Sequence, residues 1–133
     1  MVSTKGRYAL RVMIDLAEHA GEGYIPLRTT AERQGISKKY LEAIVKELVS
    51  GGLLTGVSGK GGGYKLVKDP ADYSVGEIIE LMEGPLNSVA CLAKDAACCP
   101  KAESCQTLPM WAEYDKMNRD FLYGYKLTDL IKS

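Results

Sequence analysis

Long hydrophobic runs are missing from this sequence of 133 residues. No apolar stretch approaches the roughly 18 residues that a membrane-spanning helix needs. The first eleven residues carry three basic side chains with no continuous apolar stretch behind them, which excludes a signal peptide. We therefore expect a cytoplasmic protein that does not contact a membrane.

Histidine is scarce as well, and His19 is the only one. The sequence contains no nucleophile–base pair and no acid–base pair of carboxylates at an interpretable spacing, which argues against an enzyme. It also has no internal repeats or low-complexity segments. The composition, with 46% apolar and 26% charged residues, is that of one ordinary globular domain and excludes a disordered or fibrous chain.

The sequence also has no net charge, because its 17 basic residues balance its 17 acidic ones. The charges are nevertheless unevenly distributed along the chain. Residues 1–69 carry 11 basic and 7 acidic side chains, a net charge of +4, whereas residues 70–133 carry 6 and 10, a net charge of −4. Such asymmetry is typical of a protein in which one half contacts a polyanion. Chance also produces differences of this size, so the split alone does not establish a polyanionic partner.

The spacing of apolar residues predicts a mainly α-helical protein with one small β-hairpin. In the first half we expect a helix capped by Ser3 or Thr4 and ended by the glycines at 21–23, then helices over 27–34 and 38–50 and strands over 53–57 and 64–67. In the second half we expect helices over 75–83, about 106–123 and 127–131, with an irregular segment before the long one.

The two helices that meet at Gly35 have the pattern of a helix-turn-helix. Glycine suits the tight turn because it adopts a positive φ without a Cβ clash. The second helix, capped by Ser37, would place its first turns in a DNA major groove, where Glu42 can accept a hydrogen bond from a cytosine amino group. A plain helical hairpin with a solvated charged face has the same pattern and, taken alone, is the commoner case.

The glycine-rich segment 58–63 follows this helix directly, at the position of the wing in a winged-helix protein. Its glycines allow the backbone to approach phosphates closely, and Lys60 and Lys65 add positive charge. A nucleotide-binding loop is disfavoured because Walker spacing is missing and the segment lies between two strands. The candidate DNA-binding residues are Arg28, Ser37, Lys38, Lys39, Tyr40, Glu42, Ser58, Lys60, Gly61, Gly62 and Tyr64.

All four cysteines, Cys91, Cys98, Cys99 and Cys105, lie in the irregular segment. In a reduced compartment such thiols are more often metal ligands or redox groups than disulfides, and thiolates bind iron–sulfur clusters. The spacing lacks the paired CxxC knuckles of a zinc ribbon, which disfavours zinc without excluding it. Inert buried thiols and a dithiol switch remain open at this point.

The long helix near the C-terminus has an apolar stripe that is too wide for a lone surface helix. We therefore expect a homodimer formed through this helix, with packing on its own domain as the alternative. The stripe consists of Leu108, Trp111, Tyr114, Met117 and Phe121. The chain then divides into a winged helix-turn-helix domain over 1–83, a cysteine-rich segment over 84–106, and a dimerisation helix with a C-terminal segment over 107–133.

Taken together, these motifs resemble the IscR/NsrR/CymR-like family of winged helix-turn-helix transcriptional regulators, over nearly the whole chain. The resemblance rests on STKGRYAL at 3–10, AERQGIS at 31–37, YLE at 40–42, GGGY at 61–64, VGEII at 75–79, CL at 91–92, CP at 99–100, Cys105 and Trp111. It implies a homodimer that binds a double-stranded DNA operator. It also implies a 2Fe–2S cluster, with 4Fe–4S as the alternative, held by Cys91, Cys99 and Cys105.

The chain departs from the family pattern at several positions. Regulators of iron–sulfur biogenesis have a cluster-binding histidine where this chain has Leu108, and the nitric-oxide-sensing branch has an N-terminal aspartate where this chain has Arg7. Cys98, a carboxylate, water or a group of the partner chain are therefore candidates for the fourth ligand. In the hairpin, Ser58 replaces a usual arginine and Lys60 a common proline, which shifts the expected minor-groove contact to Lys60.

The sequence thus predicts a DNA-binding transcriptional regulator whose operator affinity is controlled by an iron–sulfur cluster. Two alternatives remain. One is a cluster-free winged-helix regulator that senses through cysteine oxidation or a protein partner. The other is a redox or metal-carrier protein that does not bind DNA.

Overall fold

The computed structural model describes residues 3–84 and 106–131, so the four cysteines lie outside the described residues. The helices and strands are α1 (Thr4–Glu18), α2 (Leu27–Gln34), α3 (Lys38–Ser50), β1 (Leu54–Val57), β2 (Gly63–Leu66), α4 (Val75–Glu83), α5 (Leu108–Gly124) and α6 (Leu127–Leu130), with two short 3-10 turns at Ala20–Glu22 and Pro70–Asp72. The expected fold class, mainly α with one antiparallel hairpin, is confirmed. The 3-10 turns were not expected from the sequence.

Serine side chains begin three of the helices, among them the expected cap Ser37 and Ser3, one of the two candidates for the first helix. The hydroxyls of Ser3, Ser37 and Ser74 each accept a hydrogen bond from a backbone N–H in the first turn of α1, α3 and α4. Each bond satisfies a donor that the helix itself leaves unpaired. Gly35 ends α2 at φ +65°, a left-handed conformation that side chains other than glycine rarely adopt. These local signals set the boundaries of the helix-turn-helix.

One hydrophobic core joins α1, α3 and α4 to the base of the hairpin. Tyr73 lies fully buried in this core and fixes the hairpin through its hydroxyl. The hydroxyl donates to the carbonyl of Leu53 at 2.7 Å and accepts from the N–H of Val67 at 2.9 Å, so it connects the two residues that flank the strands. The hairpin is therefore held at a defined angle to the helices.

A buried ion pair connects α1 to α2. The Asp15 side chain is only 3% exposed, and its two carboxylate oxygens accept from the Arg33 guanidinium at 2.9 and 2.8 Å. Gln34 donates to the same carboxylate at 3.1 Å. Burial alone would raise the pKa of Asp15, but the hydrogen bonds from Arg33 and Gln34 and the positive charge of Arg33 outweigh it and hold the pKa below its usual value.

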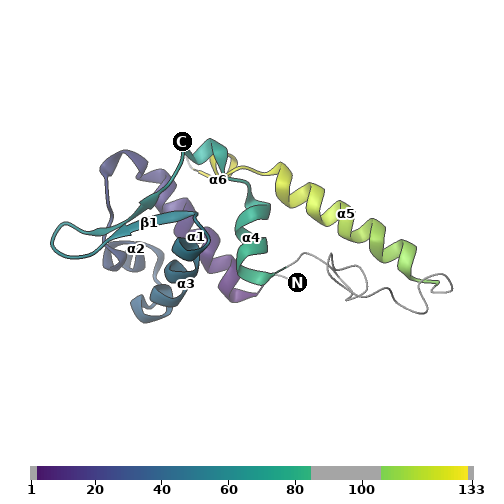
Figure 1. Cartoon of the computed structure of the whole chain (residues 1–133), viewed down its shortest axis with the longest axis horizontal. Helices are drawn as coiled ribbons and strands as arrows, with labels where there is room; N and C mark the ends of the chain where they lie inside the picture. The colour runs from purple at the N-terminus through teal and green to yellow at the C-terminus, as the bar shows by residue number, and fades with distance from the viewer. Residues whose placement is uncertain (1–2, 85–105, 132–133) are drawn as a thin grey trace.

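The C-terminal end of α5 is anchored on α4. The ring of Tyr123 occupies the space beside Gly76, where an added Cβ would lie 2.3 Å from a ring carbon. The Tyr123 hydroxyl donates to Glu80, and its burial together with this bond raises the pKa of Tyr123 to about 12, so the proton stays on the hydroxyl at neutral pH. From this anchor α5 extends away from the helical body, on the side opposite the hairpin (Figure 1).

We predict that Asp15→Asn lowers the free energy of unfolding by about 1–3 kcal/mol, because Arg33 loses its charged partner at a buried site but keeps partial contact with solvent. Since folding depresses the pKa of Asp15, the pair stabilises the native state at neutral pH, and this contribution disappears as the pH falls through the folded-state pKa. Chemical denaturation between pH 7 and pH 3 measures both effects.

The matched control is Asp120→Asn, which removes an exposed carboxylate paired with Lys116 at 3.5 Å. This variant should unfold within about 0.5 kcal/mol of the unchanged chain. Equal stability of both variants and the unchanged chain at pH 7 would show that the Asp15–Arg33 pair does not hold α1 and α2 together.

Candidate nucleic-acid interface

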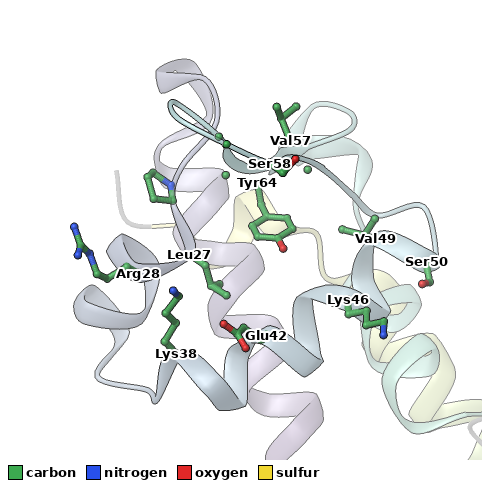
Figure 2. A pocket seen from close by; sticks show the side chains of 15 residues that line it. Leu27, Arg28, Lys38, Glu42, Lys46, Val49, Ser50, Val57, Ser58 and Tyr64 are labelled. Atoms are coloured by element: carbon green, nitrogen blue, oxygen red, sulfur yellow. The ribbon is translucent and has the colours of Figure 1, made fainter.

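A groove of about 780 Å³ separates α3 from the β-hairpin (Figure 2). We call it the α3–hairpin groove. Its residues come from the start of α2, from one face of α3, and from the hairpin. They are Pro26, Leu27 and Arg28, then Lys38, Glu42, Lys46, Val49 and Ser50, and finally Gly56, Val57, Ser58, Gly59, Gly62, Gly63 and Tyr64.

The α3 side of the groove is charged because the opposite face of the helix is apolar and buried. Leu41, Val45 and Leu48 are fully buried in the core. Lys38, Glu42 and Lys46 follow one another at intervals of four residues, which puts their side chains on one exposed face. Figure 2 shows these three side chains along the groove.

The hairpin side of the groove depends on close backbone contacts. Tyr64 and Ile25 exchange two backbone hydrogen bonds of 2.9 Å, which tie the hairpin to the residues before α2. At Gly63 an added Cβ would lie 2.3 Å from the Ile25 carbonyl, so only glycine fits. The Tyr64 ring packs against Gly56 and lines the groove between hairpin and α3 (Figure 2).

The basic side chains of residues 3–84 fall into two groups. Six of the eleven have a partner: Lys5 with Glu47, Arg7 with Thr4, Arg11 with Gln34, Arg33 with Asp15, Lys65 with the ring of Tyr24, and Lys68 with Glu77. The other five have no ion pair, hydrogen bond or ring contact within the described part of the chain: Arg28, Lys38, Lys39, Lys46 and Lys60. Three of these five line the groove.

The unpartnered basic side chains are concentrated in one part of the first half of the chain. Three of the partnered cations form ion pairs and three contact uncharged groups, whereas the unpartnered ones lie on α2, on α3 and at the hairpin tip. A surface of unpaired cations next to a glycine-rich backbone fits a polyanion whose phosphates replace solvent. The arrangement is suited to bind DNA.

The structure brings six of the sequence-predicted contact residues to the groove: Arg28, Lys38, Glu42, Ser58, Gly62 and Tyr64. Ser37 instead caps α3, and the ring of Tyr40 packs edge-on against Tyr8 with centroids 5.5 Å apart. Lys39 is exposed beside the groove, and Lys60 and Gly61 lie at the hairpin tip.

Lys46, Val49, Ser50 and Gly59 also line the groove and were missed by the sequence reasoning. The four-residue spacing from Glu42 was the available signal for Lys46.

A metal centre is not formed by the described residues, among which no group of three or more His, Cys, Asp or Glu side chains gathers. The Nδ1 atom of His19, the single histidine of the sequence, lies 2.5 Å from a carboxylate oxygen of Glu22. Arg7, at the position of the family's N-terminal aspartate, donates to the Thr4 hydroxyl. The predicted ligands Cys91, Cys98, Cys99 and Cys105 lie outside the described residues. Their donor set of thiols, in a segment without histidine, fits the chemistry of an iron–sulfur cluster.

The two ends of the cysteine-containing segment are described. Glu83, in the last turn of α4, accepts from the backbone N–H of Ser3 at 2.8 Å and from its hydroxyl at 2.5 Å. These bonds lower the pKa of Glu83 and join the end of α4 to the start of α1. At the other end, Leu108 is the first residue of α5. Within the described residues, no helix has the length and apolarity to span a membrane.

Comparisons with known proteins identify similar transcriptional regulators. A family model described as Rrf2, iron-dependent transcriptional regulator, matches residues 2–133. The transcriptional regulator IscR of Serratia proteamaculans is 36% identical over 132 residues, which cover 99% of this chain and 79% of that protein.

The solved structures that are similar over 98% of this chain include two named regulators. CymR, the global cysteine regulator of B. subtilis, superposes with a TM-score of 0.79 at 34% identity, over 95% of its chain. T. potens IscR superposes with a TM-score of 0.76 at 38% identity, over 85% of its chain. The chain belongs to the Rrf2 family of transcriptional regulators.

Proposed function

We propose that this protein regulates transcription by binding operator DNA through α3 and the hairpin, under the control of an iron–sulfur cluster held by its cysteines. The observation that carries the DNA-binding part is the set of unpaired cations around the α3–hairpin groove. The first turns of α3 enter the major groove, where Lys38 and Arg28 contact phosphates or bases. The hairpin tip brings Lys60 to the adjacent backbone or minor groove.

Glu42 has a different part in this interface. A carboxylate that faces phosphates weakens binding unless it accepts a hydrogen bond from a cytosine amino group. Glu42 therefore selects between sequences, while the lysines around it supply affinity.

The cysteines supply the sensing part of the proposal. Cys91, Cys99 and Cys105 would hold a 2Fe–2S cluster, with 4Fe–4S as the alternative, and Cys98 is a candidate for the fourth ligand. When bound, the cluster supplies a redox-active, iron-dependent centre. The chain connects this segment to the end of α4 on one side and to the start of α5 on the other. A change in the segment therefore acts on two elements that are already in contact, because Tyr123, at the far end of α5, donates to Glu80 within α4.

The control of DNA binding requires two states with different affinities for the operator. The contacts at Ser3–Glu83 and Tyr123–Glu80 hold the end of α4 and the last turns of α5, so the proposed variable is the angle at which the outer turns of α5 leave this packed unit. In a dimer joined through α5, that angle sets the separation of the two α3 helices. Only one separation matches two operator half-sites about one helical turn apart.

A homodimer through α5 is part of this proposal. The exposed stripe of α5 consists of Met110, Tyr114, Met117 and Phe121, which recur at intervals of four, three and four residues. Leu108 and Trp111, which the sequence pattern assigns to the stripe, are half-buried instead. The four- and three-residue spacing is that of a coiled-coil seam, which fits a second copy of the same helix.

A second candidate is a cluster-free regulator that senses through cysteine oxidation or a protein partner. The similarity to CymR, named a global cysteine regulator, favours this alternative over a carrier protein without DNA binding. The two candidates share the interface and differ only in the chemistry of the cysteines.

For the DNA contacts, we predict that Lys39→Ala and Lys60→Ala each weaken DNA binding and reduce the slope of log K against log salt by about 0.9 for each lost phosphate contact. Fluorescence anisotropy with a labelled duplex at several salt concentrations measures both quantities. Lys116→Ala, which removes a side chain that is 78% exposed on α5, is the control. Slopes equal to that of the unchanged protein in both variants would contradict the assignment.

For the cysteines, we predict that Cys91→Ala, Cys99→Ala and Cys105→Ala each lose the cluster or hold it loosely, because a cluster needs several correctly placed thiolates. Cys98→Ala should retain it unless Cys98 is the fourth ligand. Iron and sulfide content and visible absorbance after anaerobic purification measure the outcome. Loss in Cys98→Ala with retention in Cys99→Ala would move the ligand assignment by one residue, and zinc without iron in all variants would refute the cluster.

For the dimer, we predict that Met117→Glu and Phe121→Glu each convert the protein to a monomer, because a charge buried in an apolar seam is strongly unfavourable. Analytical ultracentrifugation measures the molecular mass. Lys116→Glu adds the same acidic side chain one residue outside the stripe and should leave the dimer intact. A mass that is unaltered by either stripe substitution would exclude α5 as the dimer interface.

A further inference from the structure

Lys46 is the last basic residue of α3 and lines the α3–hairpin groove. It lies two turns after Lys38 on the same helix face and lines the α3–hairpin groove together with hairpin residues such as Val57 and Ser58. In Figure 2 its side chain lies at the end of the groove away from Arg28, close to Ser50.

The ammonium group of Lys46 has no partner among residues 3–84. Glu42 precedes it by four residues, which is the order and spacing that favour a helical ion pair, yet the two groups form none. The neighbouring carboxylate of Glu47 is occupied by Lys5 at 2.8 Å. Lys46 is therefore free to bind an anion in the groove.

The position of Lys46 along α3 indicates that the anion it binds is a phosphate of DNA. Eight residues separate it from Lys38, which corresponds to about 12 Å along the helix axis. When the first turns of α3 are inserted in the major groove, a side chain two turns further along the helix lies outside the inserted end, near the sugar–phosphate strand at the groove edge. The hairpin approaches the same strand from the other side.

We propose that Lys46 binds a phosphate of the DNA strand that runs through the α3–hairpin groove, and that it sets affinity without reading sequence. This inference rests on the proposed DNA-binding function and deepens it. Lys46 is exposed and lines the groove together with Val49 and Val57, so its ammonium group is accessible to a phosphate there. Glu42 and Lys46, one turn apart, thus have different roles. Glu42 selects between DNA sequences, and Lys46 binds the DNA sugar–phosphate backbone.

The test compares Lys46→Gln with Glu42→Gln on two duplexes, one of random sequence and one recovered by selection from a random library. Affinities are measured by fluorescence anisotropy between 50 and 200 mM salt. Lys46→Gln should reduce the salt slope by about 0.9 per bound copy, equivalent to about an eight-fold loss at 0.1 M salt relative to 1 M, and equally on both duplexes. Glu42→Gln should instead change the ratio between the two duplexes.

The control is Lys68→Gln, which removes the same charge from a lysine that pairs with Glu77 and lies outside the groove. It should leave the slope unaltered, and thermal unfolding should show that all three variants fold as the unchanged protein does.

Three outcomes would overturn the inference. An unaltered slope in Lys46→Gln together with a changed ratio between duplexes would mean that Lys46 acts by neutralising Glu42. An equal loss in Lys68→Gln would mean that only net charge matters. If the unchanged protein binds neither duplex in a salt-dependent way, the proposed DNA-binding function fails as well, and the two failures are thereby distinguished.

Discussion

The buried carboxylate of Asp15 is the constraint on which the DNA-binding part of the structure depends. A charged group without solvent must be fully hydrogen-bonded, and Asp15 meets this need only when Arg33 and Gln34 lie at the end of α2 against α1. Gly35 follows directly, and its left-handed conformation determines where α3 begins. The pair between α1 and α2 therefore orients the helix that faces the groove, although none of its members lines the groove.

A second set of contacts connects this domain to α5. The chain returns from α5 to the core through a bridge between Ser74 and Lys126, and Leu127 is fully buried beside α1. Together with the Tyr123 ring against Gly76, these contacts make α4 and the last turns of α5 one packed unit. Any change in the residues between α4 and α5 must act on elements that already contact the core. This is the physical basis for linking the cysteines to the position of α3.

The contacts that each basic side chain makes in the folded chain decide which positive charges remain available to a ligand. A net charge of zero gives no general attraction to DNA, and even the excess of the first half is spread over eleven cations. Folding pairs three of them with carboxylates, gives three others neutral partners, and leaves the remaining five on α2, on α3 and at the hairpin tip. Unpartnered cations therefore gather near α3 and the hairpin although the whole molecule carries no net charge.

The helices, the cap at Ser37, the turn at Gly35, the hairpin and the family resemblance could all be predicted from the amino-acid sequence, because these signals are periodic or confined to a few neighbouring residues. The ligand roles of the cysteines stay predictions. Which side chains share a surface follows from the packing of the helices and could not be predicted from local sequence. This packing assigned Tyr40 to a contact with Tyr8, brought Lys46 to the groove, and paired Asp15 with Arg33 across 18 positions of the chain. These outcomes depend on the angles at which helices pack, and those angles result from the whole buried core rather than from any local pattern.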